Sequence, residues 1–381
     1  MIRTILANGE AEKTYLKELR ERQQATDAEV TRSVSEILEA VRTEGDAAVA
    51  RYTKKFDKVD GDLRVLEAAD VQKGAERVEP ALLEAMTRAA ANIRSFHERQ
   101  KAQGFVDFQE DGTFMGQRVL PLERVGLYVP GGTAAYPSSV LMNAIPARIT
   151  GVKEIVMVTP PQKDGGVRDV ILAAAALAGV DRIYLVGGAQ AVAAMAYGTE
   201  TIPRVDKIVG PGNIFVATAK RLLYGTVGID MVAGPSEILI VADDTADARY
   251  VAADIMSQCE HDKRAGGVLL TNSPALVQAV QKELVSQLKT LERSEIIRQS
   301  LADYGAMLVF STIEECFAFA NELAPEHLEI ATHDAAQYLG LVKNAGSVFL
   351  GHWTPEPVGD YYAGTNHVLP TGGTARFFSP L

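Results

Sequence analysis

The chain has 381 residues, 47% of them hydrophobic and 23% charged, which is the composition of a globular protein large enough for two or three domains. Its 49 acidic and 38 basic residues give a formal net charge of -11, which argues against nucleic acid or an anionic membrane as a partner. A small-molecule substrate fits this charge better.

Cys259 and Cys316 are the only cysteines, a usage typical of a reducing compartment and not of a disulfide framework. The N-terminal residues turn acidic before an apolar signal-peptide core could form. The longest apolar run, residues 170–180, is shorter than the roughly 20 residues that a membrane-spanning helix needs. We therefore expect a cytoplasmic protein with no membrane segment.

Residues 9–105 are rich in Ala, Glu, Arg and Lys and carry apolar residues at helical spacing, which predicts amphipathic helices broken near "FDKVDGDL". From residue 124 onward, short apolar strands alternate with helices, as in parallel βαβ units. The expected strands lie in "RVGLYV", "EIVMV", "DRIYLV", "DKIV", "SEILIVAD", "GGVLLT", "AMLVF" and "GSVFL". Segments 147–158 and 175–186 repeat one pattern, with Gly151 and Gly179 each predicted to end a helix at positive φ.

These patterns predict an α/β fold with two Rossmann-like, incomplete and doubly wound parallel-sheet domains. Residues 1–110 form an N-terminal helical segment that packs on the α/β core, residues 111–235 form the first sheet domain, and residues 236–381 form a second α/β region with a loop-rich C-terminal extension.

Three glycine-rich loops, residues 128–138, 186–192 and 209–220, each follow an expected strand and open a helix. Backbone N–H groups in such loops can face a phosphate. None completes the GxGxxG pattern. In the third loop, Gly210 and Gly212 are followed by Phe215 where the third glycine would stand. Tight turns that need glycine are the more common explanation for any one loop, but three in one half of the chain favour a bound nucleotide.

A helix expected from Ala246 to His261, with its N-cap among Asp243 to Thr245, places Gln258 and His261 on one face at its C-terminal end. Their oxygen and nitrogen donors could both bind Zn²⁺. Alternatively, His261 only stabilises the helix end as a cation while Gln258 faces water.

Two further places offer groups for proton transfer or metal binding. Glu326 and His327 are adjacent at the entry to a strand, where a carboxylate and an imidazole serve as acid and base or form a surface ion pair. The glycine-rich segment 354–377 carries Glu356, Asp360, Asn366 and His367, a set suited to binding a substrate and a metal. His97, in a charged helix, is expected to be a solvated surface residue.

Six motifs together resemble the histidinol dehydrogenase family: "GLYVPGG", "VGPGN", "DMVAGPSEILIVAD", "SQCEHD", "APEHLEI" and "TPEPVGDYYAGTNHVLPT". The resemblance covers nearly the whole chain and implies oxidation of L-histidinol to L-histidine through bound L-histidinaldehyde, with two NAD⁺ in succession. It also implies one Zn²⁺ per subunit, an NAD-binding role for residues 111–235, and a homodimer with shared active sites.

The same resemblance implies the roles of individual residues. Gln258, His261 and Asp360 would be zinc ligands, and zinc would mainly hold the substrate. His327 would take the hydroxyl proton in the first step, and Glu326 would activate the water that attacks the aldehyde. The substrate would contact Ser236, Gln258, His261, His327 and Asp360, with His367 as a further candidate, and NAD⁺ would contact Tyr128, Gln190 and Asn213.

Members of this family usually continue for several tens of residues beyond "TARFFSPL", and the resemblance implies that this tail carries one more zinc-ligating histidine and a substrate-binding glutamate. We expect the present sequence to lack that tail. Two alternatives to histidinol oxidation stay open: a zinc and NAD⁺ dehydrogenase for another polar alcohol or diol, and a form without the tail that binds a ligand or partner without turnover.

Overall fold

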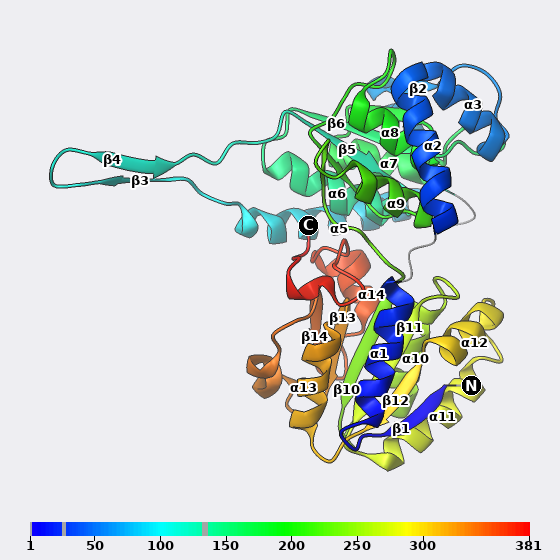
Figure 1. Ribbon diagram of the computed structural model, residues 1–381, viewed down its shortest axis with the longest axis vertical. Helices are drawn as coiled ribbons and strands as arrows, with labels where there is room; N and C mark the ends of the chain where they lie inside the picture. Colours follow the sequence, from blue (N-terminus) through cyan, green and yellow to red (C-terminus); the bar gives the residue numbers. More distant parts are fainter. Residues whose placement is uncertain (1, 25–27, 132–135) are drawn as a thin grey trace. The chain divides into compact units, whose positions relative to one another are not determined.

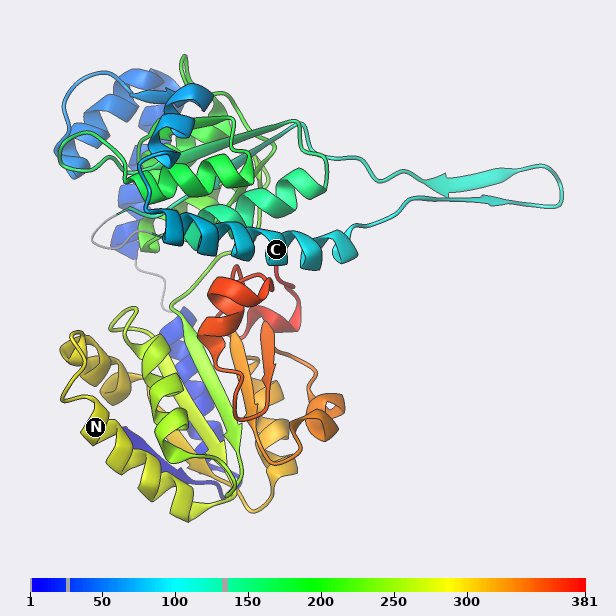
Figure 2. The same cartoon turned by 180° about the vertical axis from the view of Figure 1, so that it is seen from behind.

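The structure is a computed structural model and describes residues 2–24, 28–131 and 136–381. The chain divides into two compact units, the first comprising residues 1–26, 233–359 and 369–380, and the second residues 27–232, 360–368 and 381. Each unit has its own six-stranded sheet with helices on both faces (Figures 1 and 2). The predicted α/β fold with two parallel-sheet domains is therefore confirmed.

The sheet of the first unit is entirely parallel and has the order β1-β12-β11-β10-β13-β14. Its strands are β1 (Arg3–Leu6), β10 (Glu237–Ala242), β11 (Gly266–Thr271), β12 (Ala306–Val309), β13 (His327–Ala331) and β14 (Ser347–Leu350). The chain winds from β10 through β11 to β12 on one side and then returns to the other side of β10 with β13. This reversal makes the unit doubly wound.

Helices cover both faces of this sheet and bury apolar cores against it. One core is formed with α10 (Ala248–Cys259), α11 (Pro274–Gln287) and α12 (Ser294–Asp303), and the other with α1 (Ala11–Gln24) and α13 (Ile313–Leu323). Alternate residues of β13 face the two cores, since Ala331 belongs to the first and Leu328 and Ile330 to the second. Short helical turns follow at η2 (Ala335–Leu341), α14 (Glu356–Val358), η3 (Gly359–Ala363) and η4 (Thr374–Arg376).

The sheet of the second unit has the order β2-β7-β6-β5-β8-β9 and is parallel except for β2. Its strands are β2 (Val65–Glu67), β5 (Arg124–Tyr128), β6 (Glu154–Thr159), β7 (Arg182–Leu185), β8 (Lys207–Val209) and β9 (Gly228–Ile229). The winding reverses between β5 and β8, and the carboxyl ends of these two strands therefore flank the crevice where open α/β sheets bind ligands.

The helices of the second unit also form two cores. One face packs α4 (Ala68–Ala75), α5 (Pro80–His97), α6 (Pro137–Ile149) and α7 (Asp169–Ala178), and the other α2 (Ala28–Glu44), α3 (Asp46–Asp57), α8 (Gly188–Tyr197) and α9 (Ile214–Leu223). The short turn η1 (Glu98–Gln100) follows α5, and an antiparallel hairpin of β3 (Phe105–Phe108) and β4 (Phe114–Gln117) then extends away from the unit (Figures 1 and 2).

Every strand expected from residue 124 onward is present, and Gly151 and Gly179 have the predicted positive φ of 90° and 75°. Three features of the N-terminal third differ from the expectation of helices alone. Strand β1 completes the first sheet beside β12, β2 adds an antiparallel edge to β7, and the β3–β4 hairpin follows the last helix. Among the described residues, no helix is long and apolar enough to cross a bilayer.

The domain limits can be compared with this division. The second unit comprises residues 27–232 together with 360–368 and 381, whereas the limit between the two sheet domains was predicted at residue 235. Within the predicted helical segment 1–110, the strand β1 and helix α1 belong to the first unit, while α2 to α5 belong to the second. The chain therefore begins in the unit that also holds most of its C-terminal third.

The N-cap predicted for the helix that carries Gln258 was wrong by a few residues. Helix α10 begins at Ala248, and the Asp247 side chain accepts the N–H of Arg249 as its cap. Asp243 instead accepts hydrogen bonds from the backbone N–H groups of Thr245 and His333. The helix ends at Cys259, so His261 lies in the turn that follows it.

His97 is buried in the second unit, which corrects its prediction as a solvated residue. Its ring is 3% exposed, with Nδ1 donating to the carbonyl of Ile93 at 2.7 Å and Nε2 accepting from the Asn366 amide at 3.1 Å. The carbonyl can only accept, so this arrangement selects the neutral imidazole with its proton on Nδ1. Burial lowers the pKa of His97 below its usual 6.5.

Because the pKa of His97 is lowered in the folded chain, we expect the protein to lose part of its folding stability in mild acid. Below about pH 6.5 the unfolded chain takes up a proton that the folded chain resists, so the free energy of unfolding should fall as pH drops from 7.5 to 5.5. His97→Gln keeps an amide that can replace both hydrogen bonds but does not titrate. Urea unfolding at the two pH values should show a smaller fall for this variant, and equal falls would contradict the assignment.

Candidate active site

Glu326 and His327 lie at the amino end of β13, where the strand enters the first sheet. Glu237, at the same end of β10, holds both of them through its backbone. Its N–H donates to Glu326 Oε2 at 2.9 Å, and its carbonyl accepts from His327 Nδ1 at 3.0 Å. The register Ile238↔His327 sets this contact, so strand pairing fixes the two side chains.

The bond to the Glu237 carbonyl determines the tautomer of His327. A carbonyl oxygen only accepts, so Nδ1 carries the proton and the lone pair lies on Nε2 when the ring is neutral. Nε2 lies 3.8 Å from Glu356 Oε1, while Glu326 Oε2 lies 3.7 Å from Nδ1. His327 therefore presents a basic nitrogen toward Glu356, and its other nitrogen faces the strand.

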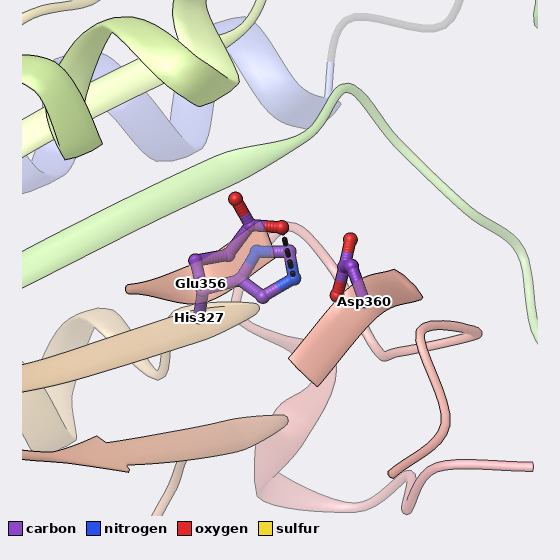
Figure 3. A group of neighbouring side chains, drawn as sticks. All are labelled: His327, Glu356 and Asp360. Carbon is purple, nitrogen blue, oxygen red and sulfur yellow. Dashed lines mark ion pairs between the residues drawn. The ribbon is translucent and has the colours of Figure 1, made fainter. Parts of the chain in front are cut away.

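A group of metal-binding type forms on this side of His327. Glu356 and Asp360 come from consecutive helical turns, α14 and η3, and the donor atoms of His327, Glu356 and Asp360 all lie within 4.8 Å of one another. Figure 3 shows the three side chains pointing toward a common space. An imidazole nitrogen and carboxylate oxygens are ordinary zinc ligands, so the residues present fit this ion.

Gln258 and His261, the predicted zinc ligands, lie at the end of α10. Gln258 is 1% exposed, and its Nε2 has no hydrogen-bond partner among the described residues. His261 remains close to it because its backbone N–H donates to the Gln258 carbonyl at 3.1 Å. Ser257, the residue before Gln258, donates to Glu356 Oε2 at 3.2 Å, which places the end of α10 beside the Glu356 side chain.

Buried carboxyl groups surround these residues, and the sequence reasoning did not single them out. Burial raises the pKa of Glu237 to about 7. Burial and the neighbouring Asp254 raise the pKa of Glu329 well above its usual value. Its Oε1 accepts the backbone N–H of Glu356 at 2.9 Å, which fixes the start of α14. An acidic residue inside an apolar strand, as in "EILIVA" and "HLEIA", is the sequence signal for both glutamates.

The remaining substrate candidates are less fully placed. Ser236 directly precedes β10 at the amino edge of the first sheet, and its carbonyl accepts the N–H of Gly266 at 3.0 Å. His367 lies in the second unit and is half-buried; it follows Asn366, whose amide donates to His97 and to the carbonyl of Met142. Asn366 is thus a structural residue of this segment.

In the second unit, the three predicted NAD⁺ residues lie at the carboxyl end of a strand or in the segment that follows one. Tyr128 is the last residue of β5, and its buried hydroxyl accepts the N–H of Gly188 at 3.0 Å. Burial raises the pKa of Tyr128 to about 12, so the hydroxyl keeps its proton at neutral pH and can donate it to a ligand. Residues 132–135 of the first glycine-rich loop lie outside the described residues.

Gln190 and Asn213 differ in how their side chains are satisfied. Gln190 is 1% exposed, and neither its amide oxygen nor its nitrogen has a hydrogen-bond partner among the described residues. Such a buried amide is costly unless a ligand or water completes it. Asn213 caps α9 by accepting the N–H groups of Phe215 and Val216. Tyr128 ends β5 and Asn213 follows β8, the two neighbouring strands between which the winding reverses.

The whole chain, and not only these two groups of residues, is similar to known proteins. A sequence profile described as histidinol dehydrogenase matches residues 20–381 of the chain. The chain belongs to the histidinol dehydrogenase family. The resemblance stated from the six motifs is therefore confirmed, and so is the expectation of a dehydrogenase enzyme.

Individual histidinol dehydrogenases match over most of their length. That of Bacillus anthracis is 55% identical over 97% of this chain and 86% of its own, and that of Lactiplantibacillus plantarum is 56% identical over 94% and 84%. The crystal structure of histidinol dehydrogenase from Elizabethkingia anophelis superposes with a TM-score of 0.93 at 39% identity and covers 100% of this chain and 87% of that one. The fold is therefore that of a solved histidinol dehydrogenase.

Proposed function

We propose that this chain oxidises L-histidinol to L-histidine, the last steps of histidine biosynthesis, through bound L-histidinaldehyde and with two NAD⁺. The observation that carries the proposal is the orientation of His327 beside Glu326. The Glu237 carbonyl holds Nδ1, and Nε2 faces Glu356 and the Asp360 turn. Family membership supplies the substrate class.

The first oxidation needs a group that removes the hydroxyl proton of the alcohol while a hydride leaves the same carbon. Nε2 of His327 is suited to this, because it carries the lone pair of the neutral ring on the side of Glu356, while Nδ1–H stays bound to the Glu237 carbonyl. The hydrogen bond also stabilises the imidazolium that forms, since the proton on Nδ1 keeps its acceptor.

The second oxidation needs water as a reactant. Glu326 removes a proton from water as the water oxygen attacks the aldehyde carbon. The resulting hydrate then loses a second hydride and a proton to give the carboxylate. The Glu237 N–H keeps Glu326 Oε2 in place, since it donates to that oxygen at 2.9 Å. Two steps in which different reactants lose a proton explain why two proton-accepting groups are paired here.

Zinc and NAD⁺ are the proposed cofactors. Zinc would supply a template that holds the amino group and imidazole of the substrate, and NAD⁺ would accept each hydride. Gln258, His261 and Asp360 are the proposed ligands of the metal. The substrate held there would also contact Ser236 and His327. The position of Gln258 and His261 at the end of α10, next to the Ser257–Glu356 contact, supports this, and the His327–Glu356–Asp360 group offers a second donor set that shares Asp360.

NAD⁺ is proposed to bind the second unit at Tyr128, Gln190 and Asn213. The unsatisfied amide of Gln190 and the position of Tyr128 and Asn213 at the winding reversal support this. The glycine-rich loops lack GxGxxG, so backbone groups and these side chains take the place of the usual fingerprint.

The test of the proposal is NADH formation from L-histidinol by the purified, zinc-loaded chain. We expect about two NADH for each histidinol consumed and L-histidine as the product. Absence of NADH and of histidine would overturn the proposal. Faster turnover of another polar alcohol or diol would favour the alternative substrate class.

We also propose that the enzyme works as a homodimer with shared active sites. The β3–β4 hairpin supports this, because its apolar side chains are more than half exposed in a single chain: Phe105, Val106, Phe108, Phe114 and Met115. An apolar patch of this kind is typical of a protein interface. The proposed location is the cytoplasm, in keeping with two buried, free cysteines.

A further inference from the structure

A buried ion pair in the second unit lies outside every role assigned above. Lys220, on α9, contacts Asp230, just after β9, and the two side chains are 3% and 1% exposed. Taking two charges out of water costs several kcal/mol per ion, and replacing such a pair with apolar residues is often neutral or stabilising. Stability alone therefore gives a weak reason for this pair.

The pair binds both polar groups of a single residue, Gly210. Asp230 Oδ2 accepts the Gly210 N–H at 2.8 Å, and Lys220 Nζ donates to the Gly210 carbonyl at 3.0 Å. Asp230 Oδ1 also accepts the N–H of Met231 at 2.6 Å. The backbone of Gly210 is thus held from two sides by charge-assisted hydrogen bonds, which are stronger than neutral ones.

Gly210 cannot be replaced by another residue in this position. Its φ is 112°, and a Cβ would collide with the carbonyl oxygen of Tyr128 at the end of β5. The loop after β8 therefore passes directly against the end of β5. Gly210 opens the segment "GPGN", which leads to Asn213 and the N-terminus of α9.

We propose that Lys220 and Asp230 are positioning residues for the dinucleotide. They hold the loop from Gly210 to Asn213 in its binding conformation before the cofactor arrives. Without the pair, the loop would have to be ordered at the moment of binding, and that entropy cost would lower the affinity for NAD⁺. The inference rests on the proposed NAD⁺ site and adds two residues that do not touch the cofactor.

The test uses a double variant, Lys220→Met with Asp230→Leu, which leaves no lone buried charge. We expect its Kd and KM for NAD⁺ to rise at least tenfold, with Kd measured by calorimetry on the zinc-loaded enzyme. The kcat at saturating NAD⁺, the KM for histidinol and the zinc content should stay within twofold. The control is Arg182→Met with Glu67→Leu, an exposed ion pair of the same unit, which should change none of these values.

A Kd for NAD⁺ within twofold of wild type would overturn the inference. So would a fall in kcat and a rise in the KM values for NAD⁺ and histidinol that are all of the same size. Hydrogen exchange of the wild-type segment 209–216 gives a second measurement that needs no variant. Protection without NAD⁺ is expected, and protection that arises only with NAD⁺ would contradict the proposal. A wild-type chain that binds no NAD⁺ at all would instead overturn the cofactor proposal itself.

Discussion

Glu326→Gln is expected to slow oxidation of the aldehyde by about 10²- to 10⁴-fold, the usual contribution of a general base, and to slow aldehyde formation by less than about tenfold. The glutamine oxygen can still accept the Glu237 N–H, so the side chain keeps its place and loses only its basicity. In a single turnover with histidinol, the variant should release the first NADH quickly and the second slowly.

Two comparisons sharpen this experiment. His327→Gln should slow the first oxidation of histidinol most strongly, because Nε2 is the proposed base for the hydroxyl proton. Glu314→Gln, at an exposed position on α13, should leave both steps within twofold of wild type. Equal slowing of the two oxidations by Glu326→Gln would remove the division of labour assigned to the pair.

The second large effect is loss of zinc from variants of its proposed ligands. The zinc content of these variants can decide between two donor sets that share Asp360. One set adds Gln258 and His261, and the other adds His327 and Glu356. We expect His261→Ala and Asp360→Ala each to lower the affinity for zinc by about 100-fold or more, and Gln258→Ala to lower it less because an amide is the weaker ligand. Glu356→Gln should keep most of the zinc. Metal content after dialysis, measured by elemental mass spectrometry, gives the result directly.

The opposite pattern would reassign the site. Zinc retained in His261→Ala but lost in Glu356→Gln would make His327, Glu356 and Asp360 the ligands, the group shown in Figure 3. His327 could not then serve as the base through the same nitrogen. Treating the wild-type enzyme with a chelator should abolish histidinol oxidation, and added zinc should restore it.

Much of the fold could be predicted because the central strands are continuous apolar runs between turns. The strand β1 could not, since "RTIL" is short, its burial alternates, and its partner β12 lies about 300 residues away in sequence. The hairpin β3–β4 gave no pattern either, because all eight of its strand residues are exposed. Local sequence carries little information on a strand whose partner is distant in sequence, or on a hairpin that has no buried face.

The same limit applies to the site. Glu326 and His327 could be proposed from adjacent side chains of the right chemistry, and Gln258 and His261 from helical spacing, although His261 lies in the turn after α10. Glu237 could not, because its contribution comes from its backbone and depends on the pairing of β10 with β13. His97 was wrongly placed at the surface, since its partner Asn366 lies 269 residues further along the chain.

The use of the Glu237 backbone has a consequence for how this enzyme can vary. No substitution at position 237 other than proline removes the N–H that holds Glu326, and none removes the carbonyl that holds His327. The two hydrogen bonds that orient the proposed proton-transfer pair therefore need no particular side chain at position 237. The backbone of a paired strand thus conserves this geometry where side chains change, a property that directed evolution of the substrate site could exploit.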